Sequence, residues 1–346
     1  MRLLVIESFM TEPLDPSVAP AGHNAAHGLL ALYRSLVLIR CSEERLSAMF
    51  ADGEVPGFIH LSIGQEAVSV GVMAALTAQD TIASTHRGHG HAIAKGLSLD
   101  GFFAELLARD TGLCRGRGGS MHVADMSVGM LGANGIVGAG LSIALGSALA
   151  HRTQKSGAIA VAFFGDGALA EGLVHECLNM AALWRLPMLF VCENNGWGEF
   201  LPTSKQLSFA LKDLAAAYRI PHVLVDGNDV AAVAEAAARI VPEVRADGPR
   251  ILECMTTRVR GHFEGDAQKY RDADDLAALS ERDPLRITAT QLVEAGIAED
   301  ALASITEEVK ARIHAAVEAA RAAPGPGFEA ALADVYTAAP AGMEAR

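Results

Sequence analysis

The sequence has few cysteines and few aromatic residues, and no apolar run long enough to cross a membrane. The five cysteines are an odd number and none forms a C-x-x-C pair, so neither a disulfide framework nor a structural zinc site is indicated. The longest apolar stretch, residues 139–150, is interrupted by Ser142, Gly146 and Ser147 and has only the length of a core helix. We therefore expect reduced thiols, most of them in a globular core.

Basic residues are outnumbered by acidic ones, 28 against 41, which gives a formal net charge of −13. This excess of negative charge opposes binding to nucleic acid and to anionic membranes. The first ten residues contain a short apolar patch but lack the length and cleavage site of a signal peptide, so we expect a cytoplasmic protein. The sequence does not distinguish Met1 from Met10 as the natural start.

The length suits one large α/β domain or two small ones, and the 51% hydrophobic content supplies a core. Residues 1–28 are rich in proline, alanine and glycine and predict a mobile arm, whereas residues 324–346 begin with a Pro-Gly repeat and predict a tail. Between them, residues 29–323 predict the folded domain. Apolar spacing predicts helices over 29–51, 65–76, 99–108, 168–183, 211–218, 230–241, 287–294 and 301–322.

The most informative stretch is residues 161–197. An apolar run over 159–164 ends at Gly-Asp-Gly, a helical pattern follows over 168–183, and a second apolar run over 188–192 ends at Glu-Asn-Asn-Gly. Runs that are apolar throughout are typical of strands buried on both faces. This order predicts a βαβ unit with two parallel neighbouring strands.

In such a unit Asp166 and Asn195 both follow the carboxyl end of a strand, the edge where open α/β sheets bind ligands. A carboxylate and an amide oxygen suit Mg²⁺ or Ca²⁺ and suit zinc poorly. A helix beginning near Ala168 would add backbone N–H groups for a diphosphate. The alternative is that the two polar segments are only turns that end two strands.

Gly-Asp-Gly followed by Asn-Asn, with Asn195 29 residues after Asp166, resembles the thiamine-diphosphate motif. The flanking sequences ALAEG, NMAALW and ENN resemble the α subunit of the two-chain E1 component of 2-oxo acid dehydrogenase complexes. The resemblance implies a Mg²⁺ ion held by Asp166, Asn195 and the carbonyl group of Trp197. It also implies that the cofactor, thiamine diphosphate, is lined by Gly165, Asp166, Gly167, Ala168 and Asn195.

Residues 81–91 contain three histidines, His86, His89 and His91. A zinc site is disfavoured because glycines separate them and no cysteine or acid lies nearby. The resemblance implies that Arg87 binds the diphosphate through its forked guanidinium, and that His86, where the family usually has tyrosine, contacts the cofactor. It also gives His89 a catalytic role in stabilising negative charge, although from the residues alone His89 is equally well structural.

Two glycine-rich segments follow. The basic one, residues 112–122, is either a phosphate nest or a flexible connector, and in the resembling family it runs beside the cofactor. The other, GIVGAG at residues 135–140, invites comparison with a dinucleotide fingerprint, but Ile143 stands where a third small residue is needed. The resemblance instead implies backbone contacts from Gly135 and Val137 to the aminopyrimidine ring.

Two further segments resemble the same family. GFIHLSIGQEA borders the active-site entrance there, although its His60 is by itself more typical of a packed histidine. Residues 258–266 contain the family's Gly-His pair, and the resemblance makes His262 a catalytic and cofactor-binding residue on a loop that orders over the cofactor. Pyruvate dehydrogenases commonly have serine next, whereas this chain has Phe263, and GHFEGDAQKYR resembles bacterial acetoin dehydrogenase α subunits.

We therefore expect an α/β fold, a mainly parallel sheet flanked by helices, with thiamine diphosphate at its carboxyl edge. The resemblance implies that the catalytic glutamate belongs to a separate E1 β subunit, so the chain should act only in an α₂β₂ heterotetramer. That enzyme would cleave acetoin to acetaldehyde and pass an acetyl unit to the lipoyl group of an E2 acyltransferase. The alternatives are a pyruvate or other 2-oxo acid dehydrogenase E1, an NAD-dependent dehydrogenase and a non-catalytic scaffold.

Overall fold

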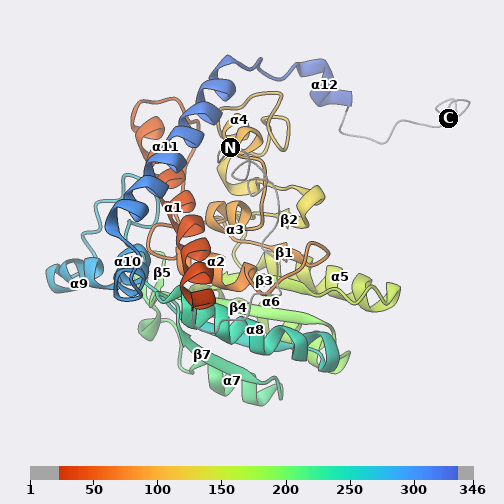
Figure 1. Cartoon of the computed structure of the whole chain (residues 1–346). Coiled ribbons are helices and arrows are strands. Elements are labelled where there is room, and N and C mark those ends of the chain that lie inside the picture. Colours follow the sequence, from red (N-terminus) through yellow and green to blue (C-terminus); the bar gives the residue numbers. More distant parts are fainter. Residues whose placement is uncertain (1–22, 334–346) are drawn as a thin grey trace, which may run out of the picture.

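A six-stranded parallel sheet lies at the centre of the computed structural model, which describes residues 23–333 (Figure 1). Its strand order is β2-β1-β3-β4-β8-β7. The strands are β1 (Thr81–Ala83), β2 (Met130–Gly132), β3 (Ala160–Gly165), β4 (Met188–Asn194), β7 (His222–Asp226) and β8 (Arg250–Met255). A separate antiparallel hairpin pairs β5 (Trp197–Gly198) with β6 (Leu201–Pro202). The prediction of an α/β fold with a mainly parallel sheet is confirmed.

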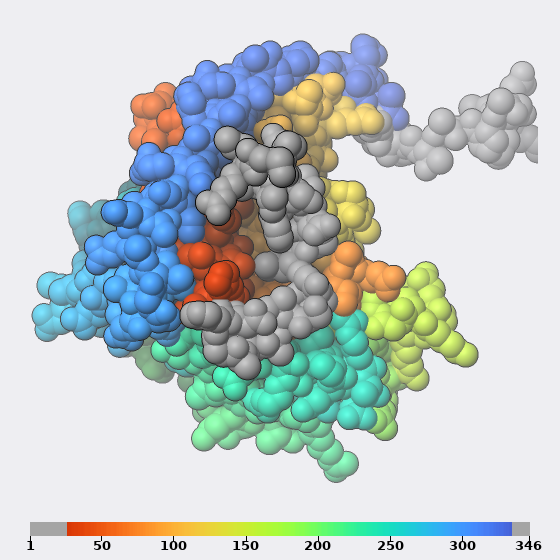
Figure 2. Space-filling view, in the orientation of Figure 1, coloured from red at the N-terminus to blue at the C-terminus, as the bar shows by residue number. Residues whose placement is uncertain are grey.

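Helices cover both faces of this sheet, and the long helices α1 and α11 run side by side (Figure 1). The helices are α1 (His23–Ala51), α2 (Glu66–Met73), α3 (His89–Ala94), α4 (Leu99–Leu106), α5 (Ala139–Gln154), α6 (Gly172–Leu183), α7 (Leu211–Ala217), α8 (Val230–Asp247), α9 (Ala273–Ala278), α10 (Pro284–Glu294), α11 (Glu299–Ala322) and α12 (Phe328–Ala333). In the space-filling view the blue surface of α9, α10 and α11 lies along the left side of the molecule (Figure 2). No helix within residues 23–333 is long and apolar enough to cross a bilayer.

The central strands are apolar throughout because they contribute to two cores. In β3, Val161 and Phe163 pack in a layer with α1, α2, α8 and α11, whereas Ala162 and Phe164 pack with α5 and α6. Successive side chains of a strand point to opposite faces, so a strand covered on both sides must be apolar at every position. The cysteines fit this arrangement, since all five are free thiols and only Cys114 is not buried.

Several element boundaries differ from the sequence expectation. Helix α1 begins at His23, six residues before the expected start, while residues 1–22 of the predicted arm and 334–346 of the predicted tail lie outside the described residues. Helix α8 continues past Pro242 to Asp247, where buried Val244 holds its last turn against the core. Its start was predicted correctly, because Asp229 accepts hydrogen bonds from the amides of Ala231 and Ala232.

Candidate active site

A cavity of about 430 Å³ opens at the carboxyl ends of β1, β3 and β4. Most of the residues predicted for the cofactor site line it: His86, Arg87, Gly135, Val137, Gly165, Gly167, Ala168, Asn195, Trp197 and His262. A larger and more open groove of about 660 Å³ lies at the amino ends of β4, β7 and β8. The predicted residues therefore gather at the edge of the sheet where α/β proteins bind ligands.

Asp166 and Asn195 meet at this edge because β3 and β4 are adjacent and parallel. Gly165 pairs with Glu193 at the ends of these strands, and the Asn195 amide then donates to Asp166 Oδ1 at 3.3 Å. The Thr203 hydroxyl donates to Asp166 Oδ2. The Asn195 side-chain oxygen accepts from the Trp197 amide at 3.0 Å. The structure thus brings together all three residues predicted to hold a metal ion.

Burial raises the pKa of Asp166 to about 6, and the hydrogen bonds from Thr203 and Asn195 offset this only in part. The carboxyl group is only 1% exposed, and both of these donors are neutral. A carboxylate in such a place is stabilised by a cation far more than by neutral donors. Asp166 therefore fits a divalent cation that is coordinated by oxygen atoms.

The helix expected to begin near Ala168 begins later. Residues Asp166–Ala170 form a turn of 3₁₀ helix, and α6 starts at Gly172. The backbone is crowded here, since a Cβ atom on Gly167 would lie 2.9 Å from the Cα atom of Gly198. The segment after β3 therefore packs directly against β5. Any backbone N–H groups offered to a ligand at Ala168 belong to this turn rather than to α6.

Two buried arginines line the cavity, Arg87 at 5% exposure and Arg258 at 2%. Arg87 donates to the carbonyl oxygens of Leu61 at 2.6 Å and His262 at 2.9 Å, and burial together with Arg258 lowers its pKa to about 10. Arg258 donates to the Glu199 carbonyl oxygen and to a tyrosine hydroxyl, and its Nε atom has no partner among the described residues. Two buried cations held by neutral oxygens favour an anionic ligand.

Sequence reasoning missed Arg258. The loop that follows β8 reads Arg-Val-Arg-Gly-His, and neither composition nor spacing shows which of its two arginines faces the cavity. Arg258 lies three residues beyond the carboxyl end of β8 and is buried in the cavity wall. Arg260 stands two positions further on and is exposed. Burial is the property that distinguishes Arg258 from Arg260, and only the folded structure reveals it.

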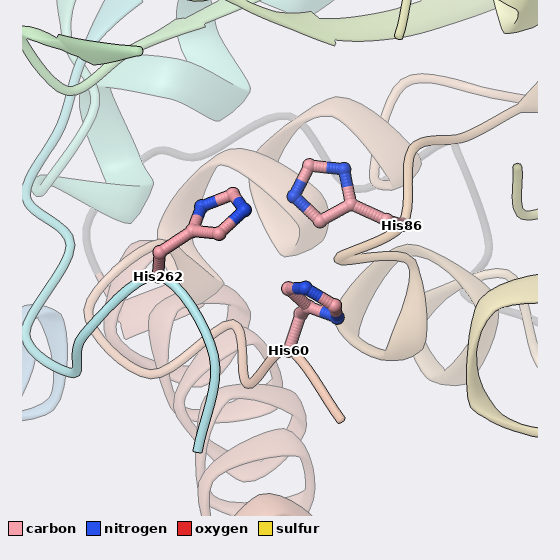
Figure 3. Close-up of side chains that lie close together, drawn as sticks. All are labelled: His60, His86 and His262. Carbon is pink, nitrogen blue, oxygen red and sulfur yellow. The ribbon is translucent and has the colours of Figure 1, made fainter. Parts of the chain in front are cut away.

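Three imidazole rings, those of His60, His86 and His262, point toward one another in the cavity (Figure 3). Their ring centroids are 4.7 Å apart for His60–His86, 5.2 Å for His60–His262 and 5.3 Å for His86–His262. Burial and the charge of Arg87 lower the pKa of His60 to about 3 and that of His262 to about 4. The rings are therefore neutral at pH 7, and each offers a hydrogen-bond donor and an acceptor.

His89 lies outside the cavity wall and is completely buried. Its Nδ1 atom contacts Glu43 Oε2 at 3.0 Å and its Nε2 atom contacts the Ser120 hydroxyl at 2.8 Å. Glu43 also accepts hydrogen bonds from the amide and hydroxyl groups of Ser62. A catalytic role for His89 stays a prediction. Its hydrogen bonds indicate a structural role, because they connect the loop at Ser120, through Glu43, to the loop at Ser62.

The basic glycine-rich loop of residues 112–122 is neither a free phosphate nest nor a flexible connector, the two alternatives that the sequence left open. Its backbone amides do form an anion nest, but the buried carboxylate of Glu105 fills that nest. The four donors are the amides of Cys114, Gly116, Gly118 and Gly119, at 2.7–3.1 Å. Glu105 thereby fixes the loop that carries Ser120 to His89 and Met121 into the cavity wall.

Gly135 and Val137 line the cavity in the segment between β2 and α5. Helix α5 packs closely against the end of β1, because a Cβ atom on Gly140 would lie 2.9 Å from the Ser84 carbonyl oxygen. Glycine permits this close approach, and both Gly140 and Ser84 line the cavity. Gly135 and Val137 therefore lie in the cavity wall, and their backbone contacts to an aminopyrimidine ring stay a prediction.

Comparisons with known proteins agree with this site. Residues 34–329 match the family described as Dehydrogenase E1 component. The acetoin:2,6-dichlorophenolindophenol oxidoreductase subunits alpha of Bacillus subtilis and Cupriavidus necator are each 47% identical, over 310 and 314 residues, which is 89% of this chain and 93% and 94% of the relatives. The pyruvate dehydrogenase E1 component subunit alpha of Zymomonas mobilis is 39% identical over 328 residues, covering 93% of this chain and 91% of the relative.

The family match covers nearly all of the described residues, and the relatives are matched over almost their whole length. Identity to the two acetoin-oxidising relatives exceeds identity to the pyruvate dehydrogenase relative. The family resemblance inferred from Asp166, Asn195 and His262 is thereby confirmed. The chain belongs to the dehydrogenase E1 component family of oxidoreductases and is similar to its α subunits.

Proposed function

We propose that this chain is the α subunit of a thiamine-diphosphate-dependent acetoin dehydrogenase E1, which cleaves acetoin to acetaldehyde and transfers the acetyl unit to a lipoyl group. Membership of the E1 family implies thiamine diphosphate as the cofactor. The observation that carries the proposal is one cavity lined by Asn195 and the buried guanidinium groups of Arg87 and Arg258, with the buried Asp166 carboxylate bonded to the Asn195 amide directly behind its wall. A diphosphate bridged to a divalent cation needs both the oxygen ligands and the guanidinium groups.

The residues present fit the cofactor in their chemistry. Asp166, Asn195 and the Trp197 carbonyl group are oxygen donors of the kind that Mg²⁺ prefers, and they would hold the ion. Arg87 and Arg258 would face the diphosphate, for which they supply positive charge. The remaining wall would be formed by His86, Gly135, Val137, Gly165, Gly167 and Ala168.

The bound cofactor supplies a nucleophilic carbon and an electron sink for cleaving the bond beside a carbonyl group. The chain's own contribution is to exclude water and to hold protons near that carbon. His262 is the first candidate, because its low pKa keeps it neutral, with one nitrogen able to donate and the other to accept. Its loop is fixed by Asp266, which accepts from the His262 amide at 2.7 Å and from the Tyr270 hydroxyl.

Acetoin is favoured over pyruvate by two observations. Identity is 47% to the two acetoin-oxidising relatives and 39% to the pyruvate dehydrogenase relative. In addition, Phe263 follows His262 and packs edge-to-face with Phe58 at 5.8 Å, just outside the residues that line the cavity. An apolar pair beside the cavity suits a neutral hydroxyketone better than a charged 2-oxo acid.

The relatives are named as subunits and components of larger enzymes, which supports a partner for this chain. We propose that the partner is an E1 β subunit, that the two form an α₂β₂ heterotetramer, and that a lipoyl-bearing E2 acyltransferase accepts the acetyl unit in the cytoplasm. The α chain alone should be inactive, because the glutamate that activates the cofactor in the resembling family belongs to the β subunit.

The test is a side-by-side assay of the reconstituted pair. The α chain is co-purified with a β-type chain, loaded with thiamine diphosphate and Mg²⁺, and given acetoin or pyruvate with dichlorophenolindophenol as electron acceptor. Acetoin should be turned over faster. Faster turnover of pyruvate would establish the 2-oxo acid alternative, and NADH binding to the α chain would favour an NAD-dependent dehydrogenase.

A further inference from the structure

We propose that His60, His86 and His262 form a second cation site in the same cavity, selective for a borderline divalent transition-metal ion such as Zn²⁺. Occupation of this site would exclude thiamine diphosphate, and that consequence rests on the function proposed above. The site differs from the Asp166–Asn195 pair in position, in donor atoms and in effect, because a cation at the oxygen pair should promote cofactor binding.

The geometry supports a three-nitrogen site. One ligand atom from each of the three histidines lies within 4.8 Å of the others. Zinc–nitrogen bonds of about 2.0–2.1 Å at tetrahedral angles place ligand atoms roughly 3.3 Å apart, so the rings need to approach by up to roughly 1.5 Å. Rotation of the three side chains about their own torsions can supply that movement, while Asp266 and Arg87 hold the backbone of His262 in place.

His60 carries the second observation. It is buried, and its Nδ1 atom has no hydrogen-bond partner among the described residues. An orphaned nitrogen lone pair or N–H group at such depth costs free energy unless a ligand satisfies it. The other two rings lie across the cavity from His60, at centroid distances of 4.7 and 5.2 Å (Figure 3). The unsatisfied nitrogen therefore belongs to a ring that already faces two potential co-ligands.

Donor chemistry separates the two cations. Imidazole nitrogen suits zinc, copper and nickel, whereas carboxylate and amide oxygens suit magnesium. Three histidines with an open fourth position are a known arrangement for zinc. The histidine site should therefore bind Zn²⁺ much more tightly than Mg²⁺, while the oxygen pair should show the opposite preference.

The surrounding charge determines the fourth ligand. Arg258 Nη1 lies 3.4 Å from His262 Nδ1, and Arg87 donates to the His262 carbonyl oxygen. Two guanidinium groups this close repel a bare cation, so the fourth ligand should be an anion that they can also contact. We therefore expect Zn²⁺ affinity to rise when chloride or inorganic phosphate is added.

The experiment is a calorimetric titration of ZnCl₂ into the untagged full chain in a non-coordinating buffer. The background variant is Cys114→Ser, which removes the one thiol that is not buried. His60→Asn, His86→Asn and His262→Asn are compared with His314→Asn, a matched change on the exposed side of α11. Cobalt absorption of the same samples reports tetrahedral nitrogen coordination.

The background and the His314→Asn control should bind one zinc ion per chain. Each of the three cavity variants should weaken binding by at least the roughly 10- to 100-fold that loss of a supporting ligand partner causes. Equal zinc affinity in all variants, or an octahedral cobalt spectrum, would overturn the site. Circular dichroism of each variant separates loss of a ligand from loss of fold.

Competition is measured by repeating the thiamine-diphosphate titration of the reconstituted pair with Mg²⁺, with and without Zn²⁺. Zinc should weaken cofactor binding in the Cys114→Ser background and much less in His86→Asn. If zinc binds but the cofactor does not bind even without zinc, the function proposed above fails and the histidine site stands. If the cofactor binds and zinc neither binds nor competes, only the histidine site fails.

Discussion

Asn195 donates its backbone N–H to the buried carboxylate of Asp166 at 3.3 Å, although the two residues are 29 positions apart in the chain. The parallel pairing of β3 with β4 produces this contact, since both strands end at the same edge of the sheet. The fold thus fixes the relative position of the two oxygen-bearing side chains before any ion arrives. Predictions about the site follow from this contact and from the arginines beside it.

The pH dependence of cofactor binding should report the titration of Asp166. Its pKa is raised to about 6 by burial, so below pH 6 a proton competes with the metal ion for the carboxylate. We expect the Mg²⁺-dependent affinity for thiamine diphosphate to fall about tenfold per pH unit below about 6. Calorimetry at pH 7, 6 and 5 measures it, and an affinity that is flat across this range would contradict the assignment.

The metal-free protein should show the opposite trend in stability. Because the folded pKa lies above the ordinary value of 3.8, the folded state binds the proton more tightly than the unfolded state between about pH 4 and 6. The free energy of unfolding should therefore fall as pH rises, by roughly 1 kcal/mol between pH 5 and 7 from this group. Urea unfolding of the chain and of Asp166→Asn isolates the effect, which should be absent from the variant.

Replacing Arg87 by lysine should weaken cofactor binding while leaving the positive charge in place. Lysine loses the planar fork and cannot keep both carbonyl contacts, to Leu61 and to His262. A charge-assisted hydrogen bond is worth about 1.5–3 kcal/mol, so the dissociation constant should rise about 10- to 100-fold. Arg34→Lys is the matched control, since Arg34 is half exposed and pairs with Glu308 at the surface. An unchanged dissociation constant in Arg87→Lys would remove Arg87 from the diphosphate site.

Glu105→Gln should destabilise the fold although the two side chains have nearly the same shape. The new amide group would point its hydrogens at two of the four backbone amides that the carboxylate now accepts from. Leaving two buried donors unsatisfied costs about 2–5 kcal/mol. Urea unfolding measures the loss, and Glu235→Gln on the exposed side of α8 should change stability by less than about 0.5 kcal/mol. Equal stability of the two variants would show that Glu105 does not hold the loop.

The central βαβ unit could be predicted from sequence because its signals are long and local. Six or more consecutive apolar residues, a glycine-rich turn and a helical pattern occur together around Asp166, and each is visible within a few positions. By contrast, β1 and β2 are three residues each, too short to show any periodicity. The start of α6 was misplaced for a different reason: a 3₁₀ turn and the first turn of an α-helix have nearly the same sequence preferences.

The parts of the site that sequence did not reveal depend on contacts between distant segments. His60 and His262 are about 200 positions apart and become neighbours only because α1, the sheet and the loop after β8 are packed together. Glu105 looks like any helical glutamate, and only the folded glycine-rich loop shows that its carboxylate is an internal anion. Residue type and spacing identify candidates for chemistry, but burial decides which of them face the cavity.

The most direct test of the proposed site is thiamine-diphosphate binding to the reconstituted pair, measured by calorimetry with and without Mg²⁺ for the wild type, Asp166→Ala and the exposed control Asp213→Ala. Wild type and Asp213→Ala should bind only with Mg²⁺, and Asp166→Ala should bind at least about 100-fold more weakly, because a principal oxygen ligand is lost. Equal affinity of Asp166→Ala and the wild type in the presence of Mg²⁺ would contradict the metal-bridged diphosphate site.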